Sequence, residues 1–166
     1  MSKKITFPYN PQFPSVADLR KRAKSRIPKF AFDYLEGGCN EGLNLSRNES
    51  DFDNIYLKPN YLRVGGDIDM SVELFGRRYS APFGISPIGL QGLMWPNAPE
   101  ILAKAAAKAD IPYTLSTVST SSIERIAEVS EGKAWFQLYH PAEDRLRDDI
   151  INRAAAAECP VLVILC

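Results

Sequence analysis

The sequence has little from which to build a metal site, a disulfide framework or a membrane span. Its 166 residues include one histidine, His140, and three scattered cysteines that form no Cys-x-x-Cys pair. No run of about 18 or more apolar residues is present, so no transmembrane helix is expected. The opening MSKKITFPYNPQFP lacks the apolar centre of a secretion signal. We therefore expect a soluble, cytoplasmic protein without a metal.

The sequence also lacks an excess of charge of either sign. Lysine plus arginine and aspartate plus glutamate each number 20, so the formal net charge is zero at pH 7. Proteins that bind nucleic acid through its phosphates carry a basic excess, so we expect no nucleic-acid partner. With 45% hydrophobic and 24% charged residues, the composition is that of a globular domain, either a small-molecule enzyme or a structural and binding module.

The first 80 residues predict three short helices and a hairpin. The helices are expected over residues 15–26, 28–36 and 41–53. Ser15 and Asp18 have the spacing of a capping box, and Gly37-Gly38 ends the second helix. The irregular stretch that follows contains short alternating runs and a Phe75-Gly76 turn, which indicate a small hairpin.

From Ala81 onward, apolar runs alternate with segments of helical pattern. The runs are PFGISPI, IPYTLSTV, KAWFQLY and VLVILC, and the intervening helices are expected over 97–110, 120–131 and 141–158. The runs are continuous rather than alternating, which is typical of strands buried on both faces. Strands that alternate with helices predict parallel βαβ units with right-handed crossovers.

Each of these helices carries a start signal. Asn97 and Glu100 occupy expected N-cap and N3 positions, and Ser121 and Glu124 have the capping-box spacing. Pro141 is expected in the first turn of the last helix.

Two architectures fit four such strands: a compact doubly wound sheet, or the first half of an eight-stranded barrel. In both, ligands bind at the carboxyl ends of the strands. The sequence ends its four runs with polar or turn-forming residues at 86–89, 116–117 and 137–139 and with Leu165-Cys166.

Five motifs resemble those of a known family in order and spacing. They are FAFDYLEGG at 30–38, SRNESDFDNIYLKPNYL at 46–62, APFGISPIGLQGLMWP at 81–96, IPYTLSTVSTSSIE at 111–124 and WFQLY at 135–139. The chain resembles the FMN-dependent α-hydroxy acid dehydrogenases and oxidases, which include L-lactate dehydrogenase, glycolate oxidase and mandelate dehydrogenase.

The resemblance implies an α/β fold, the (β/α)8 TIM barrel, in a protein more than twice this length. Residues 1–80 would form the N-terminal helical and short-strand region. Residues 81–166 would form the first four βα units of an FMN-binding barrel, ending at strand four.

The resemblance also implies an activity and a set of residues. The family oxidises an L-2-hydroxy acid to the 2-keto acid and passes a hydride equivalent to FMN. Tyr34 matches a substrate-carboxylate ligand, and Tyr139 matches a catalytic tyrosine that contacts the substrate and its developing keto oxygen. Gln137 matches the glutamine at the pyrimidine edge of the flavin. The other positions that match flavin contacts are Ser86, Pro87, Ile88, Gly89 and Ser116.

The sequence departs from the family pattern in places. Ile88 stands where oxidases commonly have threonine and lactate-dehydrogenase-like members can have an apolar residue, and Gly89 stands where many oxidases have alanine, which favours a dehydrogenase. Leu165 replaces a flavin-binding threonine. The family's base histidine, carboxylate-binding arginine, flavin-side lysine and phosphate site belong to strands five to eight, and His140 does not match the base. We therefore expect these residues alone to be inactive.

Two alternatives stay open beside an FMN enzyme of 2-hydroxy acids. The chain could be a non-catalytic α/β module that forms a homo-oligomer through its open strand edges, or a partner chain could supply strands five to eight. Some family members attach to a membrane through a segment inserted after strand four, which would lie beyond these residues.

Overall fold

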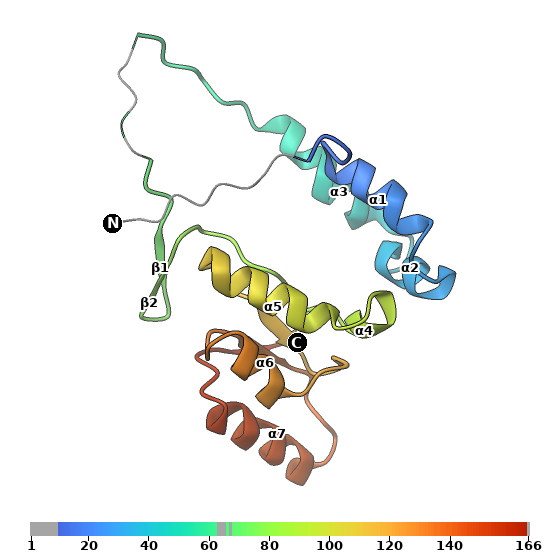
Figure 1. The fold of residues 1–166 in the computed structure, drawn as a ribbon, viewed down its shortest axis with the longest axis vertical. Coiled ribbons are helices and arrows are strands. Elements are labelled where there is room, and N and C mark those ends of the chain that lie inside the picture. Colours follow the sequence, from blue (N-terminus) through green and yellow to red (C-terminus); the bar gives the residue numbers. More distant parts are fainter. Residues whose placement is uncertain (1–9, 63–65, 67, 166) are drawn as a thin grey trace. The chain divides into compact units, whose positions relative to one another are not determined.

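The computed structural model describes residues 10–62, 66 and 68–165 (Figure 1). Its internal contacts separate an N-terminal unit, Asn10–Asp69, from a C-terminal unit that begins at Met70. The expected hairpin therefore groups with the C-terminal unit. The first nine residues and Cys166, the expected end of the fourth strand, lie outside the described residues.

The N-terminal unit contains the three predicted helices. They are α1 (Val16–Lys24), α2 (Lys29–Glu36) and α3 (Leu43–Ser50), and α3 continues into the 3₁₀ helix η1 (Asp51–Asn54). The predicted capping box is confirmed, since the Ser15 hydroxyl accepts from the Asp18 N–H while the Asp18 carboxylate accepts from the Ser15 N–H. The third helix is shorter than predicted because its last turn tightens into η1.

The C-terminal unit contains a hairpin and then alternating helices and strands. The elements are β1 (Val72–Leu74), β2 (Arg77–Tyr79), α4 (Gln91–Met94), α5 (Ala98–Ala109), β3 (Thr114–Ser116), α6 (Ile123–Val129), β4 (Trp135–Leu138), α7 (Asp144–Ala156) and β5 (Leu162–Ile164). Strands β3, β4 and β5 form a parallel sheet in that order, which confirms the predicted βαβ units. In the part of the chain that the structure describes, every helix is too short or too polar to cross a membrane.

The register of the sheet sorts its side chains onto two faces. Leu115 pairs with Phe136 and Ser116 pairs with Gln137, and neighbouring residues of a strand point to opposite faces. Leu115 and Phe136 belong to the buried apolar cluster that includes residues of α5, α6 and α7. The three helices pack in sequence on that face, α5 against α6 and α6 against α7 (Figure 1). Ser116 and Gln137 therefore face away from the helices.

The first apolar run of this unit differs from the prediction. Residues 82–88 form no extended strand, and their pairing is reduced to a single parallel bridge between Ile85 and Tyr113. The Ile85 N–H donates to the Pro112 carbonyl, and the next donor on that edge would belong to Pro87, which has no N–H, so the pairing ends there. Gly84 lies against Pro112, where a Cβ would come within 2.8 Å of the Pro112 carbonyl oxygen.

The helices α5, α6 and α7 begin near the predicted residues, but the predicted capping interactions differ from those in the structure. Asn97 precedes α5, but its backbone is left-handed and its side chain makes no capping hydrogen bond. The N-cap of α6 is Ser122 rather than Ser121, and its hydroxyl accepts from the Arg125 N–H. Pro141 lies before α7, which begins at Asp144.

The shift of the α6 N-cap from Ser121 to Ser122 has a visible cause. The Ser121 hydroxyl donates instead to Glu100 of α5, at 2.8 Å. This hydrogen bond joins α5 to the start of α6 and leaves the capping position to the next serine. The short helix α4, which was not predicted, fills the connection before α5.

The hairpin contacts the amino end of β4. The indole N–H of Trp135 donates to the Tyr79 hydroxyl at 2.9 Å, and the Phe75 ring meets the indole edge-on with centroids 5.4 Å apart. These aromatic contacts lie at the end of β4 opposite to Gln137.

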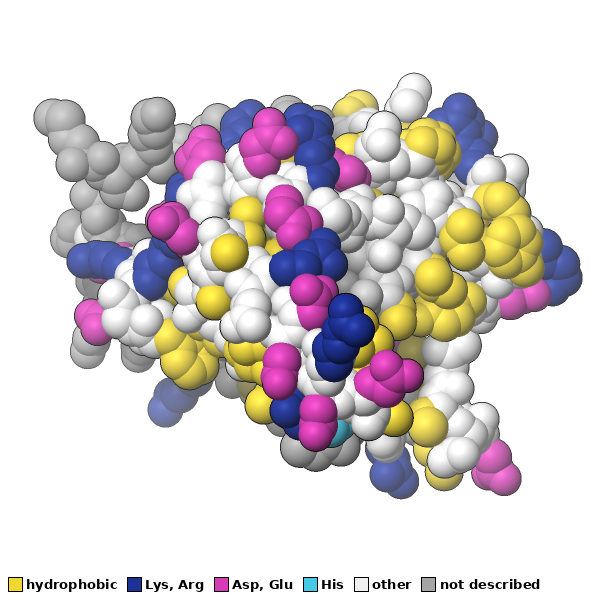
Figure 2. Space-filling view, turned by 90° about the horizontal axis from the view of Figure 1, so that it is seen from below, with side chains coloured by type: hydrophobic (Ala, Val, Ile, Leu, Met, Phe, Trp, Pro, Cys, Tyr) yellow, Lys and Arg dark blue, Asp and Glu magenta, His cyan; other side chains and the backbone are white. Residues whose placement is uncertain are grey.

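The outer surface of α7 is charged with both signs. Figure 2 shows acidic and basic side chains side by side on this face of the molecule. Arg147 pairs with Asp144 and Asp148, and Arg153 makes two hydrogen bonds to the Glu124 carboxylate of α6, at 2.8 and 3.0 Å. The charged face of α7 is therefore solvated, and its arginines form surface ion pairs.

The Glu124–Arg153 pair makes the stability of the chain depend on acid pH. The hydrogen bond from Arg153 lowers the pKa of Glu124 from its ordinary value of 4.5 to about 2. A carboxyl whose pKa is lowered on folding stabilises the folded state above its unfolded pKa, and that contribution is lost as pH falls through the folded value. In thermal unfolding, Glu124→Gln should lower the Tm at pH 7, and the difference from wild type should shrink between pH 4.5 and pH 2.

Glu128→Gln provides the control for this experiment. It also removes one carboxylate from α6, whose partner Arg125 lies on the same helix, so it does not link two helices. Its Tm difference should be smaller at pH 7. A Glu124→Gln difference that is equally large at pH 2 and pH 7 would contradict the assignment.

Gly84→Ala should destabilise the C-terminal unit. The new methyl group would lie 2.8 Å from the carbonyl oxygen and 2.9 Å from the Cβ of Pro112, so the bridge next to it must shift. We expect a loss of about 1–3 kcal/mol in the free energy of unfolding, measured by urea titration. Gly66→Ala is the control, because a Cβ there meets nothing within 4 Å, and an equal loss in both variants would refute the close approach.

Candidate functional site

The predicted flavin residues lie at one end of the parallel sheet. Ser86–Gly89 follow the bridge at Ile85, and Ser116 is the last residue of β3. Gln137 is the last residue but one of β4. Tyr139 follows β4 directly. Since all of these strands run parallel, their carboxyl ends share one edge, and the structure brings these residues together there.

Tyr34 is distant from this group in the sequence and belongs to the other unit of the chain. It belongs to α2 of the N-terminal unit, and its side chain is 54% exposed. The site described below consists of residues of the C-terminal unit alone.

The turn after Ile85 is tied down to the segment that follows β3. The Leu90 N–H donates to the Val118 carbonyl at 3.0 Å, and the Gly92 N–H donates to the Thr120 hydroxyl at 3.1 Å. Two hydrogen bonds therefore hold the backbone directly after residues 86–89, the segment predicted to face the flavin. The fit at Gly92 is close, because a Cβ there would overlap the Thr120 hydroxyl.

A buried side-chain pair adds a third tie, which the sequence analysis missed. The Tyr113 hydroxyl donates to Gln91 Oε1 at 3.0 Å, and both residues are almost fully buried. Burial, and secondarily the charge of Glu100, raises the pKa of Tyr113, so its hydroxyl stays protonated and available as the donor. No motif in the sequence marks these two residues as partners.

Gln137 carries the clearest sign of a ligand in the sheet. Its side chain is 1% exposed, and within the described residues neither its Oε1 nor its Nε2 has a hydrogen-bond partner. A buried amide without partners costs free energy, so such groups are normally satisfied by protein, water or ligand. A carboxamide both donates and accepts, and therefore matches a ligand edge that presents a donor beside an acceptor.

Ser116 stands opposite Gln137 in the register and is also buried. Its hydroxyl accepts from the Val118 N–H at 3.3 Å, which leaves its own proton free to donate. The pair therefore offers a hydroxyl and a carboxamide on the same face of neighbouring strands.

Tyr139 presents its side chain at the rim of this site. The residue is 48% exposed, and its N–H donates to the Thr117 hydroxyl at 3.0 Å. The backbone is thus held while the phenol stays accessible to a ligand. His140, the next residue, is exposed, and Leu165 beyond β5 offers a backbone N–H to the Leu138 carbonyl but no side-chain hydroxyl.

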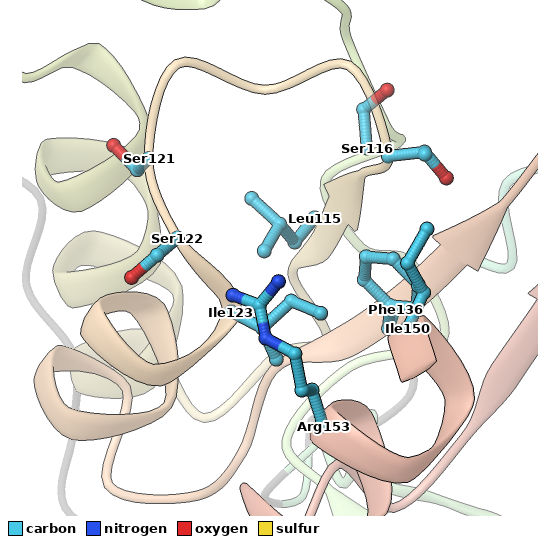
Figure 3. Close-up of a pocket in the computed structure, with 9 residues that line it drawn as sticks. Leu115, Ser116, Ser121, Ser122, Ile123, Phe136, Ile150 and Arg153 are labelled. Carbon is cyan, nitrogen blue, oxygen red and sulfur yellow. The ribbon is translucent and has the colours of Figure 1, made fainter. Parts of the chain in front are cut away.

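A separate cavity of about 190 Å³ lies on the helix-facing side of the sheet. Figure 3 shows Leu115, Ile123, Phe136 and Ile150 around it, with Ser121 and Ser122 on the approach to α6. Of the predicted flavin residues, Ser116 alone contributes to its lining, and Arg153 at its edge is paired with Glu124. Because Gln137 faces the opposite side, this cavity is not the predicted flavin site.

The described residues hold no group of histidine, cysteine, aspartate or glutamate side chains arranged to bind a metal. The site is instead built from hydroxyls, one carboxamide and backbone amides. Such donors suit a polar organic ligand.

Known proteins share both the sequence and the fold of this chain. Residues 23–166 match the FMN-dependent dehydrogenase family model. The L-lactate dehydrogenase of Ectopseudomonas mendocina (strain ymp) is 40% identical over 146 residues, which are 88% of this chain and 38% of that protein. The (S)-mandelate dehydrogenase of Pseudomonas putida is 42% identical over 125 residues, 75% of this chain and 32% of that protein.

Solved structures agree with these matches. A crystal structure of mandelate oxidase with (S)-4-hydroxymandelic acid superposes with a TM-score of 0.84 at 34% identity, covering 92% of this chain and 42% of that one. The chain thus spans about two fifths of the length of the relatives that it matches. The match to the family model over most of the chain, together with relatives of about 40% identity, shows that the chain belongs to the FMN-dependent dehydrogenases, a family of oxidoreductases whose cofactor is FMN.

Proposed function

We propose that this chain forms part of an FMN-dependent enzyme that oxidises an L-2-hydroxy acid to the 2-keto acid. Its C-terminal unit contributes the first half of a (β/α)8 barrel, and the carboxyl ends of its strands hold the flavin ring and the substrate. The unpartnered carboxamide of Gln137 is the observation that carries this proposal, since it needs the kind of ligand that the family's cofactor provides.

The donor set fits FMN. The uracil-like edge of a flavin alternates acceptors and donors, which one carboxamide can meet with both of its polar atoms. Gln137 and Ser116 would bind this edge, and the backbone of 86–89 would face the ring. FMN, when bound, supplies the acceptor for the two electrons that the substrate loses.

The substrate would lie next to Tyr139. Its accessible phenol can donate a hydrogen bond to the substrate oxygen that becomes the keto group, or to the carboxylate. Tyr34 on α2 is proposed as a second carboxylate ligand. The base, the carboxylate-binding arginine and the phosphate site would come from strands five to eight, so residues 1–166 alone should bind flavin weakly and turn nothing over.

The edge of the sheet supports the half-barrel proposal. Among the described strands, β5 pairs with β4 alone, and Ile164 of β5 is 61% exposed. An apolar parallel strand with an open edge is the place where the next strand of a barrel would continue the sheet. A lactate-like substrate is favoured, because Gly89 fits a dehydrogenase and an L-lactate dehydrogenase is among the relatives.

Gln137→Leu tests the flavin site. The substitution should be measured in a chimera that carries this chain in place of the matching N-terminal part of the Ectopseudomonas mendocina L-lactate dehydrogenase. We expect FMN affinity to fall about 5- to 150-fold, the equivalent of about 1–3 kcal/mol in lost hydrogen bonds, by fluorescence titration.

The same variant separates a ligand role from a structural one. Because the protein offers this carboxamide no partner, the leucine should leave the Tm of the flavin-free chimera unchanged or raise it. A lower Tm with unchanged FMN affinity would mean that Gln137 serves the fold and not the cofactor.

Tyr139→Phe and Tyr34→Phe should affect different kinetic constants in the chimera with L-lactate. Loss of the Tyr139 phenol should lower kcat by about 10²-fold, because it removes a donor to charge that develops during the reaction. Loss of the Tyr34 hydroxyl should mainly raise KM, by about tenfold, because it removes a contact to the substrate carboxylate.

Tyr79→Phe is the matched control. It removes a phenol that accepts from Trp135 at the opposite end of β4, so it should lower the Tm and leave kcat and KM unchanged. Negligible kinetic effects of both Tyr139→Phe and Tyr34→Phe would refute the assigned substrate site.

A further inference from the structure

A single hydroxyl joins the ends of the two strands that carry the proposed site. The Thr117 side chain donates to the Gln137 carbonyl at 2.5 Å and accepts from the Tyr139 N–H at 3.0 Å. Both distances are those of ordinary hydrogen bonds. The hydroxyl therefore contacts the main chain of the proposed flavin ligand and of the proposed substrate ligand.

The register explains why a side chain is needed here. At the start of β4 the Trp135 N–H donates to the Tyr113 carbonyl at 2.8 Å. In a parallel ladder this pattern repeats every two residues, so four residues further the Tyr139 N–H would meet the carbonyl of Thr117.

The main chain has left the ladder at that point. Strand β3 ends at Ser116, whose carbonyl accepts from the Ser119 N–H in a turn. The Thr117 hydroxyl then bonds the Gln137 carbonyl of β4 and the Tyr139 N–H just after it, the two groups that the departing backbone would have paired. One side chain thus extends the sheet by a step while its own backbone turns away.

Leu138 lies between the two residues that the Thr117 hydroxyl contacts. Leu138 separates Gln137 from Tyr139 and is buried in the apolar cluster, so the segment is fixed on the helix-facing side. On the ligand side, Gln137 has no side-chain partner among the described residues. On the β3 side, the Thr117 hydroxyl holds the segment at its carboxyl end through hydrogen bonds to Gln137 and Tyr139.

We propose that Thr117 is a positioning residue that sets the Gln137 carboxamide and the Tyr139 phenol in their working orientation. The inference rests on the proposed function, because it assigns to Thr117 a role in the site that Gln137 and Tyr139 would form. Thr117 itself touches neither flavin nor substrate in this assignment.

The test uses the ¹⁵N-labelled 166-residue chain, first without FMN. In the wild type, the Tyr139 N–H should exchange slowly with solvent. In Thr117→Val, which keeps the shape and loses the hydroxyl, its exchange should be about tenfold faster, and Thr117→Ser should restore the wild-type rate.

The second measurement adds FMN as the probe. Excess FMN should shift the side-chain amide resonances of Gln137 in the wild type and in Thr117→Ser, and half-saturation in Thr117→Val should need about tenfold more FMN. Ser130→Ala is the control. It removes a buried hydroxyl that also accepts a backbone N–H, but at the far end of α6, and it should leave the FMN response unchanged.

The outcomes separate the inference from the function on which it rests. If FMN shifts Gln137 equally in wild type and Thr117→Val, and Tyr139 exchange does not change, the inference is wrong and the proposed function stands. If excess FMN shifts other resonances of the wild type and leaves those of Gln137 unshifted, the proposed flavin site fails and the inference with it. Should Thr117→Val not fold, rapid exchange of Tyr139 in the wild type would by itself overturn the inference.

Discussion

The parallel register of β3 against β4 is the constraint on which the rest of the site depends. It places Ser116 opposite Gln137 and turns both away from the helices, while Leu115 and Phe136 are packed beneath them. One residue of slip would exchange these faces, burying the carboxamide among apolar side chains. The apolar cluster on the helix side therefore determines which residues face the ligand, and stability and function share one register.

The fold was predictable where the hydrophobic pattern was strong. The runs that became β3, β4 and β5 are continuous and apolar, and the intervening helices are long enough to show their period. The prediction failed where local chemistry overrode the pattern. Pro87 deprives the first run of its next ladder donor after Ile85, and several serines before α6 compete for one capping position.

The residues of the candidate site were predictable from family resemblance and not from the hydrophobic pattern. Gln137 and Tyr139 were found through resemblance to a family, since a glutamine within WFQLY has no unique meaning in a single sequence. The unsatisfied state of the Gln137 amide and the two bonds of Thr117 depend on the point at which β3 leaves the ladder, and no short-range pattern encodes that point. Likewise, the tie between Tyr113 and Gln91 joins residues 22 positions apart.

The most direct test of this account locates bound FMN by NMR on the 166-residue chain. The account predicts nuclear Overhauser contacts between the side-chain amide protons of Gln137 and the imide proton at the pyrimidine edge of the flavin. The competing location is the cavity between the sheet and α6 and α7, lined in part by Ile123 and Arg153. Contacts from FMN to those residues, with none to Gln137, would contradict the account.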